Sequence, residues 1–320
     1  MAIDALASAC EDQAVRPKVI VVCGPTAVGK TALGIELAAA VGGEIISADS
    51  MQVYRGMDIG TAKPTTAERA AVRHHLIDVL DPDESFDAAQ FARMGRQVAH
   101  ELHGRRKVPV IVGGTGLYIK ALLAGIFRSG PGAPEVRRRL RAEAEAQGLA
   151  ALHARLGACD PETARRIHPN DAVRILRALE VFEAAGRPLS QLQREHRFRD
   201  TPFTALKIGL STEREELYQR IDRRVEAMVA AGLEAEVRSL LEKGYGPELK
   251  PMQSIGYSHM AALIDGSVSR QECLRTLKRD TRRFAKRQLT WFRADPQIIW
   301  FAPGQSGEVI ELTRGFLGPG

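Results

Sequence analysis

The sequence predicts an α/β fold, in which a mainly parallel sheet is flanked by helices and interrupted by an all-helical insertion. Short apolar runs alternate with amphipathic helical patterns along most of the chain, which is typical of strand–helix–strand units. The alternation stops between residues 129 and 202, where only helical patterns occur. A glycine-bounded loop joins the first apolar run to the first helical pattern, as expected beside a parallel sheet.

Six apolar runs bounded by turn signals are the expected strands, at residues 19–23, 44–47, 75–79, 109–112, 205–210 and 298–301. The clearest helix is expected over residues 87–103, on an apolar stripe of Phe91, Met94, Val98 and Leu102. Asp87 and Gln90 have the spacing of a capping box at its start, and Gly104 follows its end.

The helical insertion is expected over residues 129–202, between the breaker-rich segments SGPGAPE and FRDTPF. One of its helices should begin at Asp160-Pro161, because aspartate caps a helix and proline suits the first helical position. Residues 18–128 and 203–320 then form the core, after a loose tail over residues 1–17. Two core helices are expected, at 214–232 and at 270–293, the second with a buried stripe of Leu274, Leu277, Phe284 and Trp291.

Composition predicts a folded cytoplasmic protein without a membrane segment. The chain has 320 residues, of which 44% are apolar, but no apolar stretch is long enough to cross a bilayer. Its start lacks the basic and apolar regions of a signal peptide. The four cysteines are far apart, which argues against a zinc site or a disulfide framework.

Positive charge is concentrated in two segments of a chain whose net charge is +6. Residues 129–206 contain thirteen Arg and no Lys, and residues 270–293 contain nine Lys or Arg against two acids. Guanidinium groups bind phosphates in a bidentate fork, so both segments are candidate polyanion surfaces. The alternative to a polyanion surface is a solvent-exposed helix face on which arginine and glutamate alternate. It applies above all to the first segment, which contains ten acids.

The segment GPTAVGKT has the glycine, lysine and threonine spacing of a phosphate-binding loop, with a strand before it and a helix after it. Its glycines let several N–H groups point inward, its lysine reaches the outer phosphate, and Thr31 can bind Mg²⁺. A purely structural glycine turn is the alternative. We therefore expect a P-loop NTPase-like core with phosphates bound by Gly24, Pro25, Thr26, Ala27, Val28, Gly29, Lys30 and Thr31.

Two acids follow expected strands. Asp78 stands where a nucleotide-hydrolysing enzyme or kinase would place a Mg²⁺ ligand, but the acidic loop after it favours a structural role. Asp49, in ISADSMQVYRGMDIGTAKP, should face the phosphate loop as a general base, a magnesium partner or a helix cap. Its neighbours Ser50 and Gln52 carry groups that can read the edge of a base.

A third stretch, VIVGGTGLYIKALL, places three glycines at a strand-to-helix junction. Glycine there lets the backbone approach a ligand or another element closely, and Thr115 would present its hydroxyl to the same crevice. A tight packing turn without chemistry is the competing interpretation.

Together, GPTAVGKT, SADSMQVYRGMDIGTAKP, VGGTGLYIKALLAG, HPNDAVRILRALEVFEAAGRPLS, QSIGY and TRRFAKRQLTWFR resemble, in this order, the bacterial tRNA dimethylallyltransferases, also called tRNA isopentenyltransferases. The resemblance spans residues 19–293. It implies transfer of a dimethylallyl group from dimethylallyl diphosphate to the exocyclic amine of the adenosine 3′ of the anticodon, in tRNAs reading codons that begin with U. Diphosphate leaves whole, with Mg²⁺ as the implied cofactor.

The resemblance also implies roles for single residues. Asp49 would take the proton of the amine, Lys30 would stabilise the departing diphosphate, and Thr115 would orient one of the reacting groups. The insertion would bind the anticodon stem-loop. The implied tRNA contacts are Asp49, Ser50, Met51, Gln52, Asn170, Val173, Arg174, Ile175, Leu176, Arg177, Lys286 and Arg287. Val28 replaces a serine common in the family, and Ser258 replaces a cation or amide.

Three functions remain distinguishable at this point. The first is prenyl transfer to tRNA by a monomer, with no membrane partner. The second is a P-loop kinase of the nucleoside-monophosphate type, because such kinases also combine this core with helical inserts. The third is an RNA-binding module whose loop only senses a nucleotide such as ATP. Nucleotide binding alone would not separate them, because a loop of this kind accepts many diphosphates.

Overall fold

The computed structural model describes residues 16–126, 134–196 and 200–318. Residues 1–15 of the expected tail and residues 129–133, where the insertion is expected to begin, lie outside this range. Two compact units divide the chain: one joins Met1–Leu123 to Pro202–Gly320, and the other is Ala124–Thr201. These boundaries fall near the breaker-rich segments of the sequence.

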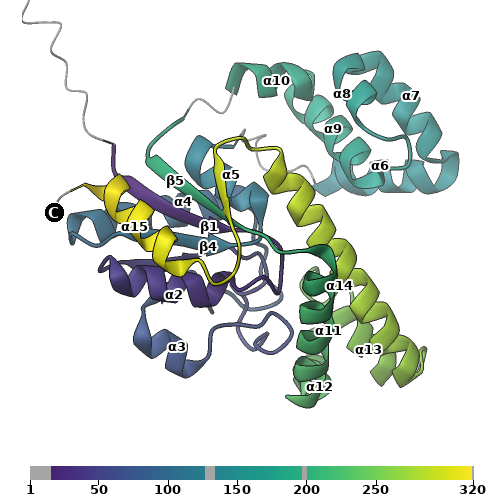
Figure 1. Ribbon diagram of the computed structural model, residues 1–320. Coiled ribbons are helices and arrows are strands. Elements are labelled where there is room, and N and C mark those ends of the chain that lie inside the picture. Colours follow the sequence, from purple (N-terminus) through teal and green to yellow (C-terminus); the bar gives the residue numbers. More distant parts are fainter. Residues whose placement is uncertain (1–15, 127–133, 197–199, 319–320) are drawn as a thin grey trace, which may run out of the picture. The chain divides into compact units, whose positions relative to one another are not determined.

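The larger unit contains a six-stranded parallel sheet with the order β3-β2-β4-β1-β5-β6 (Figure 1). This confirms the expected α/β core. The central strand β1 is buried along its apolar run and pairs with β4 on one side and β5 on the other. The strands are β1 (Lys18–Cys23), β2 (Glu44–Ser47), β3 (His74–His75), β4 (Pro109–Gly113), β5 (Thr204–Leu210) and β6 (Ile298–Phe301).

The strand expected over residues 75–79 is wrong beyond His75. Leu76 and Asp78 have positive φ values of 62° and 57°, which a strand cannot contain. The turn is fixed by the carboxylate of Asp78, which accepts hydrogen bonds from Lys63 at 2.5 Å and Arg69 at 2.7 Å. The structural role expected for Asp78 therefore has a physical basis in this ion-pair cluster.

Helices α2 and α15 cover one face of the sheet, and α4 and α5 cover the other (Figure 1). The expected capping box of α4 is confirmed: Asp87 accepts the N–H groups of Ala89 and Gln90, and the Gln90 side chain accepts the N–H of Asp87. The helices around the sheet are α2 (Lys30–Ala40), α3 (Thr66–Ala71), α4 (Ala88–Gly104), α5 (Gly116–Ala124) and α15 (Ser306–Leu317).

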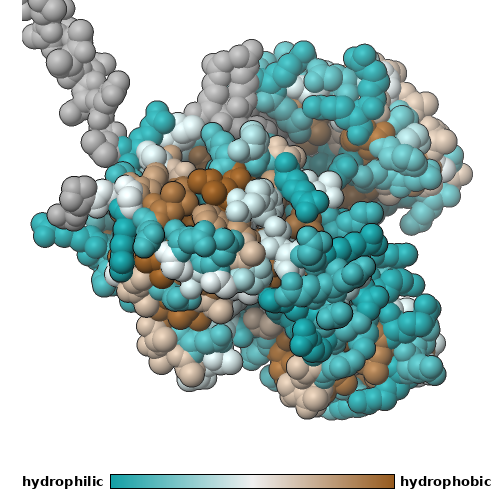
Figure 2. Space-filling view, viewed as in Figure 1, coloured by the Kyte–Doolittle hydropathy of each residue, from teal (hydrophilic) through white to brown (hydrophobic). Residues whose placement is uncertain are grey.

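Four further helices of the larger unit pack together: α11 (Arg214–Ala230), α12 (Leu233–Glu242), α13 (Tyr257–Ile264) and α14 (Arg270–Arg293). The expected helix over 214–232 ends earlier, because Gly232 has a φ of 99°. The outer surface of α11 and α14 is largely hydrophilic (Figure 2). Among the described helices, none is both long and apolar enough to cross a bilayer.

Helix α14 has the expected ends but a different buried face. Leu277 is buried as predicted, whereas Phe284 is 36% exposed and Trp291 is 46% exposed. The expectation of a buried aromatic stripe is therefore wrong. The helix instead turns Ala285, Gln288 and Phe292 inward, and Gln288 lies against the backbone of two loops.

The smaller unit is all-helical, with a core formed by residues such as Leu152, Leu156 and Leu179. As predicted, a helix begins after Asp160, whose carboxylate accepts the N–H of Thr163. The surface arginines are mostly paired with acids, which supports the alternative of a glutamate-laced face for much of this unit. Its helices are α6 (Pro134–Gln147), α7 (Leu149–Cys159), α8 (Pro161–Arg166), α9 (Ala172–Ala185) and α10 (Leu189–His196).

Candidate active site

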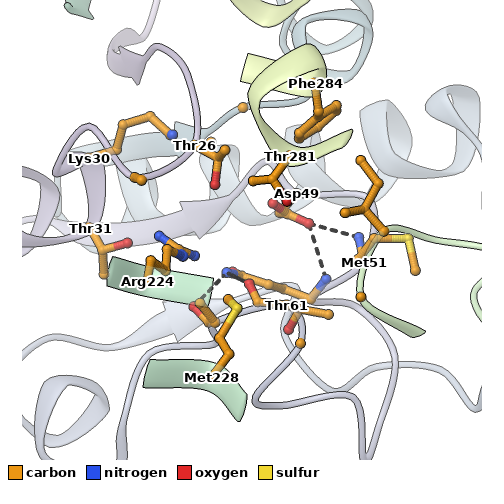
Figure 3. Close-up of a pocket in the computed structure, with 18 of the residues that line it drawn as sticks. Thr26, Lys30, Thr31, Asp49, Met51, Thr61, Arg224, Met228, Thr281 and Phe284 are labelled. Carbon is orange, nitrogen blue, oxygen red and sulfur yellow. Dashed lines mark hydrogen bonds between the residues drawn. The ribbon is translucent and has the colours of Figure 1, made fainter. Parts of the chain in front are cut away.

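A cavity of about 660 Å³ lies in the larger unit, beside the carboxyl ends of β1, β2 and β4. One side of it is formed by the phosphate loop and by the residues that follow β2 and β4. The other side is formed by α11, α14 and residues 253–257. Figure 3 shows polar side chains from both sides directed into this space.

The phosphate loop has the backbone that its glycines predict. Gly24 has a φ of 142°, and a Cβ there would lie 2.5 Å from the carbonyl oxygen of Leu210. Gly29, with a φ of 107°, precedes α2, whose first N–H groups are left without intrahelical partners. Val28 is fully buried away from the cavity, so the serine-to-valine departure does not alter the lining.

Two cations face each other across the cavity. Burial lowers the pKa of Lys30 to about 8, the nearby Arg224 charge acts in the same direction, and Asp49 opposes both. Burial also lowers the pKa of Arg224, which points into the space between Thr31 and Asp49 (Figure 3). Within the described residues, Arg224 forms no hydrogen bond or ion pair. Enclosed cations of this kind are suited to an anionic ligand.

The sequence interpretation missed Arg224. Its signal lies in the amphipathic pattern of α11, because Arg224 follows Leu217 by seven positions and therefore lies on the same inward stripe as Ile221 and Val225. A cation on a buried stripe is a stronger indication of a binding site than the exposed cations around it.

Asp49 lies two positions after the last residue of β2. Its Oδ1 accepts the N–H of Met51 at 2.8 Å and of Gln52 at 3.3 Å. One carboxylate oxygen therefore caps the turn that follows, which agrees with the expected alternative of a cap. Thr115 lies beside it, because the Thr115 hydroxyl accepts the N–H of Ser50 at 3.1 Å. The sequence thus correctly predicted that these residues share the crevice with the phosphate loop.

The three glycines around Thr115 serve close packing. A Cβ at Gly113 would overlap the carbonyl oxygen of Ala48, which brings the ends of β2 and β4 together. Gly114 lies against the side chain of Gln288, and Gly116 lies under the edge of the Trp291 ring. Tight packing therefore explains these glycines, and it also places Thr115 at the cavity.

The side chain of Gln52 is used inside the protein. Its Nε2 donates to the carbonyl oxygens of Thr61 at 3.3 Å and Ala62 at 3.2 Å, and its Oε1 accepts the hydroxyl of Ser47 at 2.9 Å. Both amide hydrogens therefore have partners within the protein. The amide stabilises the turn at Thr61 and Ala62, and the expectation that it reads a base edge is wrong for this conformation.

Gln288 is a second residue that the sequence interpretation missed. It is buried on α14, accepts the N–H of Thr26 at 2.8 Å and donates to the carbonyl oxygen of Gly114 at 2.9 Å. A polar side chain inside an otherwise apolar helix face was its only signal in the sequence.

The remaining expected tRNA residues fall into two groups. Lys286 and Arg287 are exposed on α14, where the Arg287 guanidinium lies 5.7 Å from the centroid of the Phe284 ring. In the smaller unit, Asn170 and Arg174 are exposed, Val173 is 79% exposed, and Arg177 pairs with Glu180 at 3.1 Å.

Two of these expectations need correction. Ile175 is fully buried in the core of the smaller unit, and Leu176 packs against that core. The expected contact of Ile175 with RNA is therefore wrong. The helical period of 3.6 residues directs Val173 and Arg174 to the surface and Ile175 to the core.

A metal would find few protein ligands here. The described residues contain no group of three or more His, Cys, Asp or Glu side chains that could hold one. Thr31 in the phosphate loop and the carboxylate of Asp49 are among the oxygen groups that line the cavity. This donor set suits Mg²⁺, which commonly binds one or two protein oxygens together with substrate phosphates and water.

Residues 52–295 match the IPP transferase family. The tRNA dimethylallyltransferase of Desulfosudis oleivorans is 59% identical over 303 residues, 94% of this chain and 96% of that protein. The tRNA dimethylallyltransferase of Syntrophobacter fumaroxidans is 58% identical over 297 residues, 92% of this chain and 87% of that protein.

Solved structures that are similar to this chain belong to the same kind of enzyme. The full-length tRNA isopentenylpyrophosphate transferase of Bacillus halodurans is 41% identical with a TM-score of 0.70, covering 94% of this chain and 97% of that one. A eukaryotic dimethylallyltransferase acting on tRNA is 29% identical with a TM-score of 0.80, covering 94% of this chain and 79% of that one. The phosphate loop, the cavity at the strand ends and these matches lead to one conclusion: the chain belongs to the IPP transferase family.

Proposed function

We propose that this chain transfers a dimethylallyl group from dimethylallyl diphosphate to the exocyclic amine of the adenosine 3′-adjacent to the anticodon, in tRNAs reading codons that begin with U. The observation that carries the proposal is the cavity itself, which is lined by a phosphate loop, by two enclosed cations and by the Asp49 carboxylate. The named relatives support transfer to tRNA over the kinase alternative.

The diphosphate binds between the phosphate loop and α11. Its oxygens face the N-terminus of α2, the Lys30 ammonium and the Arg224 guanidinium, which stabilise the negative charge that grows as the carbon–oxygen bond breaks. The dimethylallyl group then lies against apolar side chains of the same cavity, including Ile221, Val225 and Met228. Diphosphate leaves whole, and the freed carbon forms its new bond to nitrogen.

Asp49 accepts the proton of the amine as the carbon–nitrogen bond forms. Its Oδ1 is held by two backbone N–H groups, and within the described residues Oδ2 has no hydrogen-bond partner. Oδ2 is therefore the atom that accepts the proton, and this proton transfer accelerates the reaction roughly 10²–10⁴-fold. Thr115, held against the backbone of Ser50, orients the adenosine beside it.

Mg²⁺ fits the diphosphate end of this site. Thr31, at the start of α2, would supply a protein oxygen, and phosphate and water oxygens would supply the other ligands. When bound, the ion neutralises part of the diphosphate charge. The chain acts as a monomer in this proposal, since every group named belongs to one copy.

The adenosine reaches the cavity by leaving the base stack, at a cost of ~a few kcal/mol. Phosphates of the anticodon stem-loop meet the cations that remain exposed, Lys286 and Arg287 on α14 and Arg174 on α9. Val173 offers an apolar surface beside Arg174.

The test combines the purified protein, Mg²⁺, labelled dimethylallyl diphosphate and unmodified tRNA. We expect a prenylated adenosine after digestion, and none when the adenosine 3′ of the anticodon is changed to guanosine. Asp49→Asn should retain the turn cap yet lose most of the rate. The matched control is Asp265→Asn, because Asp265 caps a turn through Ser267 at 2.8 Å outside the cavity. ATP-dependent phosphorylation without prenylated product would overturn the proposal.

A further inference from the structure

Glu236 on α12 joins three segments that are distant in the sequence. Its Oε2 accepts the N–H groups of Asp58 at 3.0 Å and Ile59 at 2.7 Å. Its Oε1 accepts the N–H of Gly60 at 3.1 Å and the hydroxyl of Tyr257 at 2.6 Å. One carboxylate therefore satisfies three successive backbone donors and a buried phenol, an arrangement that requires acceptors at both oxygens.

Packing makes this junction rigid. Tyr257 is fully buried, and a Cβ at Gly60 would lie 2.5 Å from the Tyr257 ring and 2.9 Å from Leu233. Burial and the neighbouring Glu236 charge both raise the pKa of Tyr257, so its hydroxyl stays protonated and remains a donor. The backbone turn at residues 58–62 is thus held both by the hydrogen bonds to Glu236 and by steric contact with Tyr257 and Leu233.

The turn continues into the cavity. Gly60, Thr61 and Ala62 line it, whereas Glu236 does not. The carbonyl oxygens of Thr61 and Ala62 receive both hydrogens of the Gln52 amide. The backbone N–H of Gln52 in turn donates to Oδ1 of Asp49 at 3.3 Å. An unbroken series of contacts therefore leads from Glu236 through the turn and Gln52 to Asp49.

We propose that Glu236 is a positioning residue for the transfer reaction. It holds the turn at residues 58–62 so that Gln52 and, through it, the carboxylate of Asp49 keep one orientation. The inference rests on the proposed function, in which Asp49 accepts the proton. Glu236 itself touches no substrate, because it lies behind the cavity wall.

The substitution Glu236→Gln tests the hydrogen bonds of this side chain at nearly constant volume. Glu236→Gln has nearly the same size, but its NH₂ group must face one pair of the four donors, so at least one backbone N–H loses its acceptor. A displacement of Asp49 of about 1 Å is enough to reduce the rate roughly 100-fold. We therefore expect single-turnover rates 10- to 100-fold lower, with unchanged affinity for dimethylallyl diphosphate. Tyr257→Phe removes one donor and should give a smaller loss in the same direction.

The matched control is Glu234→Gln. Glu234 lies two positions earlier on α12 and pairs with Arg238 at 3.2 Å and Arg270 at 3.3 Å at the surface. It should change neither the rate nor the affinity. A general weakening of α12 would affect both variants, whereas loss of the junction affects only Glu236→Gln.

A double-mutant cycle with Asp49→Asn tests the direction of the effect. If Glu236 acts through Asp49, Glu236→Gln should slow the wild-type chain but have little further effect on Asp49→Asn. Equal slowing in both backgrounds, or no slowing in either, would overturn the inference.

Amide hydrogen exchange supplies a readout that needs no catalysis. Exchange in residues 49–62 should accelerate in Glu236→Gln and in Tyr257→Phe but not in Glu234→Gln. Unchanged exchange would refute the inference even if the wild-type chain prenylates tRNA. Faster exchange in a chain that forms no prenylated adenosine would refute the proposed function instead.

Discussion

Gln288 on α14 and Thr26 in the phosphate loop are 262 positions apart in the chain, yet the Gln288 side-chain oxygen accepts the Thr26 N–H at 2.8 Å. The nitrogen of the same amide donates to Gly114 after β4. A single side chain therefore sets the distance between the phosphate loop and the loop that carries Thr115. In the proposed reaction, this side chain would couple diphosphate binding to adenosine orientation.

Gln288→Leu should test this coupling. The change leaves a buried N–H and a buried carbonyl without partners, which costs about 1–3 kcal/mol for each group in the free energy of unfolding. We expect a lower midpoint in urea and a higher KM for dimethylallyl diphosphate. Gln271→Leu, at an exposed position of the same helix, is the control and should change neither value. A normal KM in Gln288→Leu would contradict the bridging role.

The lowered pKa of Lys30 predicts a pH dependence of substrate capture. As the pH rises through about 8, the free chain loses the Lys30 proton and with it the attraction for the diphosphate. The kcat/KM for dimethylallyl diphosphate should therefore fall, by up to about tenfold per pH unit above that value. Lys30→Arg keeps its charge throughout, so its lower activity should lack this decline. A flat wild-type profile between pH 7 and 10 would refute the prediction.

Asp78→Asn should affect stability and not the metal. Partial burial alone would raise the pKa of Asp78, but hydrogen bonds from Lys63 and Arg69 hold it below the ordinary value. Its stabilising contribution is thus present above the ordinary pKa and is lost as the pH falls through the lowered one. We expect the free energy of unfolding to drop by about 1–3 kcal/mol at neutral pH, after allowing for solvent screening, and by less in acid.

The Mg²⁺ concentration for half-maximal activity should be the same in Asp78→Asn as in the wild-type chain. The exposed Asp83→Asn is the control for the loss of one acid. A large rise in the Mg²⁺ requirement of Asp78→Asn alone would restore the possibility of a metal ligand.

Two glycine substitutions should have opposite signs. Gly60→Ala introduces a Cβ 2.5 Å from the Tyr257 ring, so overpacking should destabilise the larger unit by about 1–3 kcal/mol and reduce turnover. Gly157→Ala, inside α7, meets nothing within 4 Å and should stabilise the smaller unit by about 0.5–1 kcal/mol through helix propensity. Thermal unfolding of both variants provides the comparison, and a stable, active Gly60→Ala chain would contradict the packing.

Removal of exposed cations on α14 should change the salt dependence of tRNA binding. Lys286→Gln and Arg287→Gln should each reduce the slope of log K against log salt by about 0.7–0.9, if each binds one phosphate. The control is Arg275→Gln, because Arg275 is already paired with Glu272 at 2.6 Å. An unchanged slope in Lys286→Gln and Arg287→Gln would place the tRNA backbone elsewhere.

Local signals in the sequence were sufficient for most of the fold. Alternating apolar runs predicted five of the strands nearly to their ends, and the cap at Asp87 predicted the start of α4, because these features depend on neighbours in the chain. The failed strand after His75 had the same apolar appearance. Its backbone is decided by an ion pair with Lys63, which no local pattern contains.

The candidate site shows the same division. The phosphate loop, Asp49 and Thr115 lie on recognisable motifs at strand ends, so their meeting could be predicted. Gln288 and Glu236 act by spanning loops that are distant in sequence, and their roles appear only when the contacts are known. Amphipathic periodicity also misassigned Trp291, because it did not show that Gln288 and Phe292 are the buried residues at this end of the helix.

The order of the strands has a consequence for synthesis of the protein on the ribosome. Strand β1 emerges among the first residues, but its second neighbour, β5, begins only at Thr204, after the whole helical unit. Until then one edge of this apolar strand has no partner, and such an edge can pair with other chains. The nascent chain therefore passes through a long stage that invites aggregation, and early folding of the helical unit does nothing to shorten it.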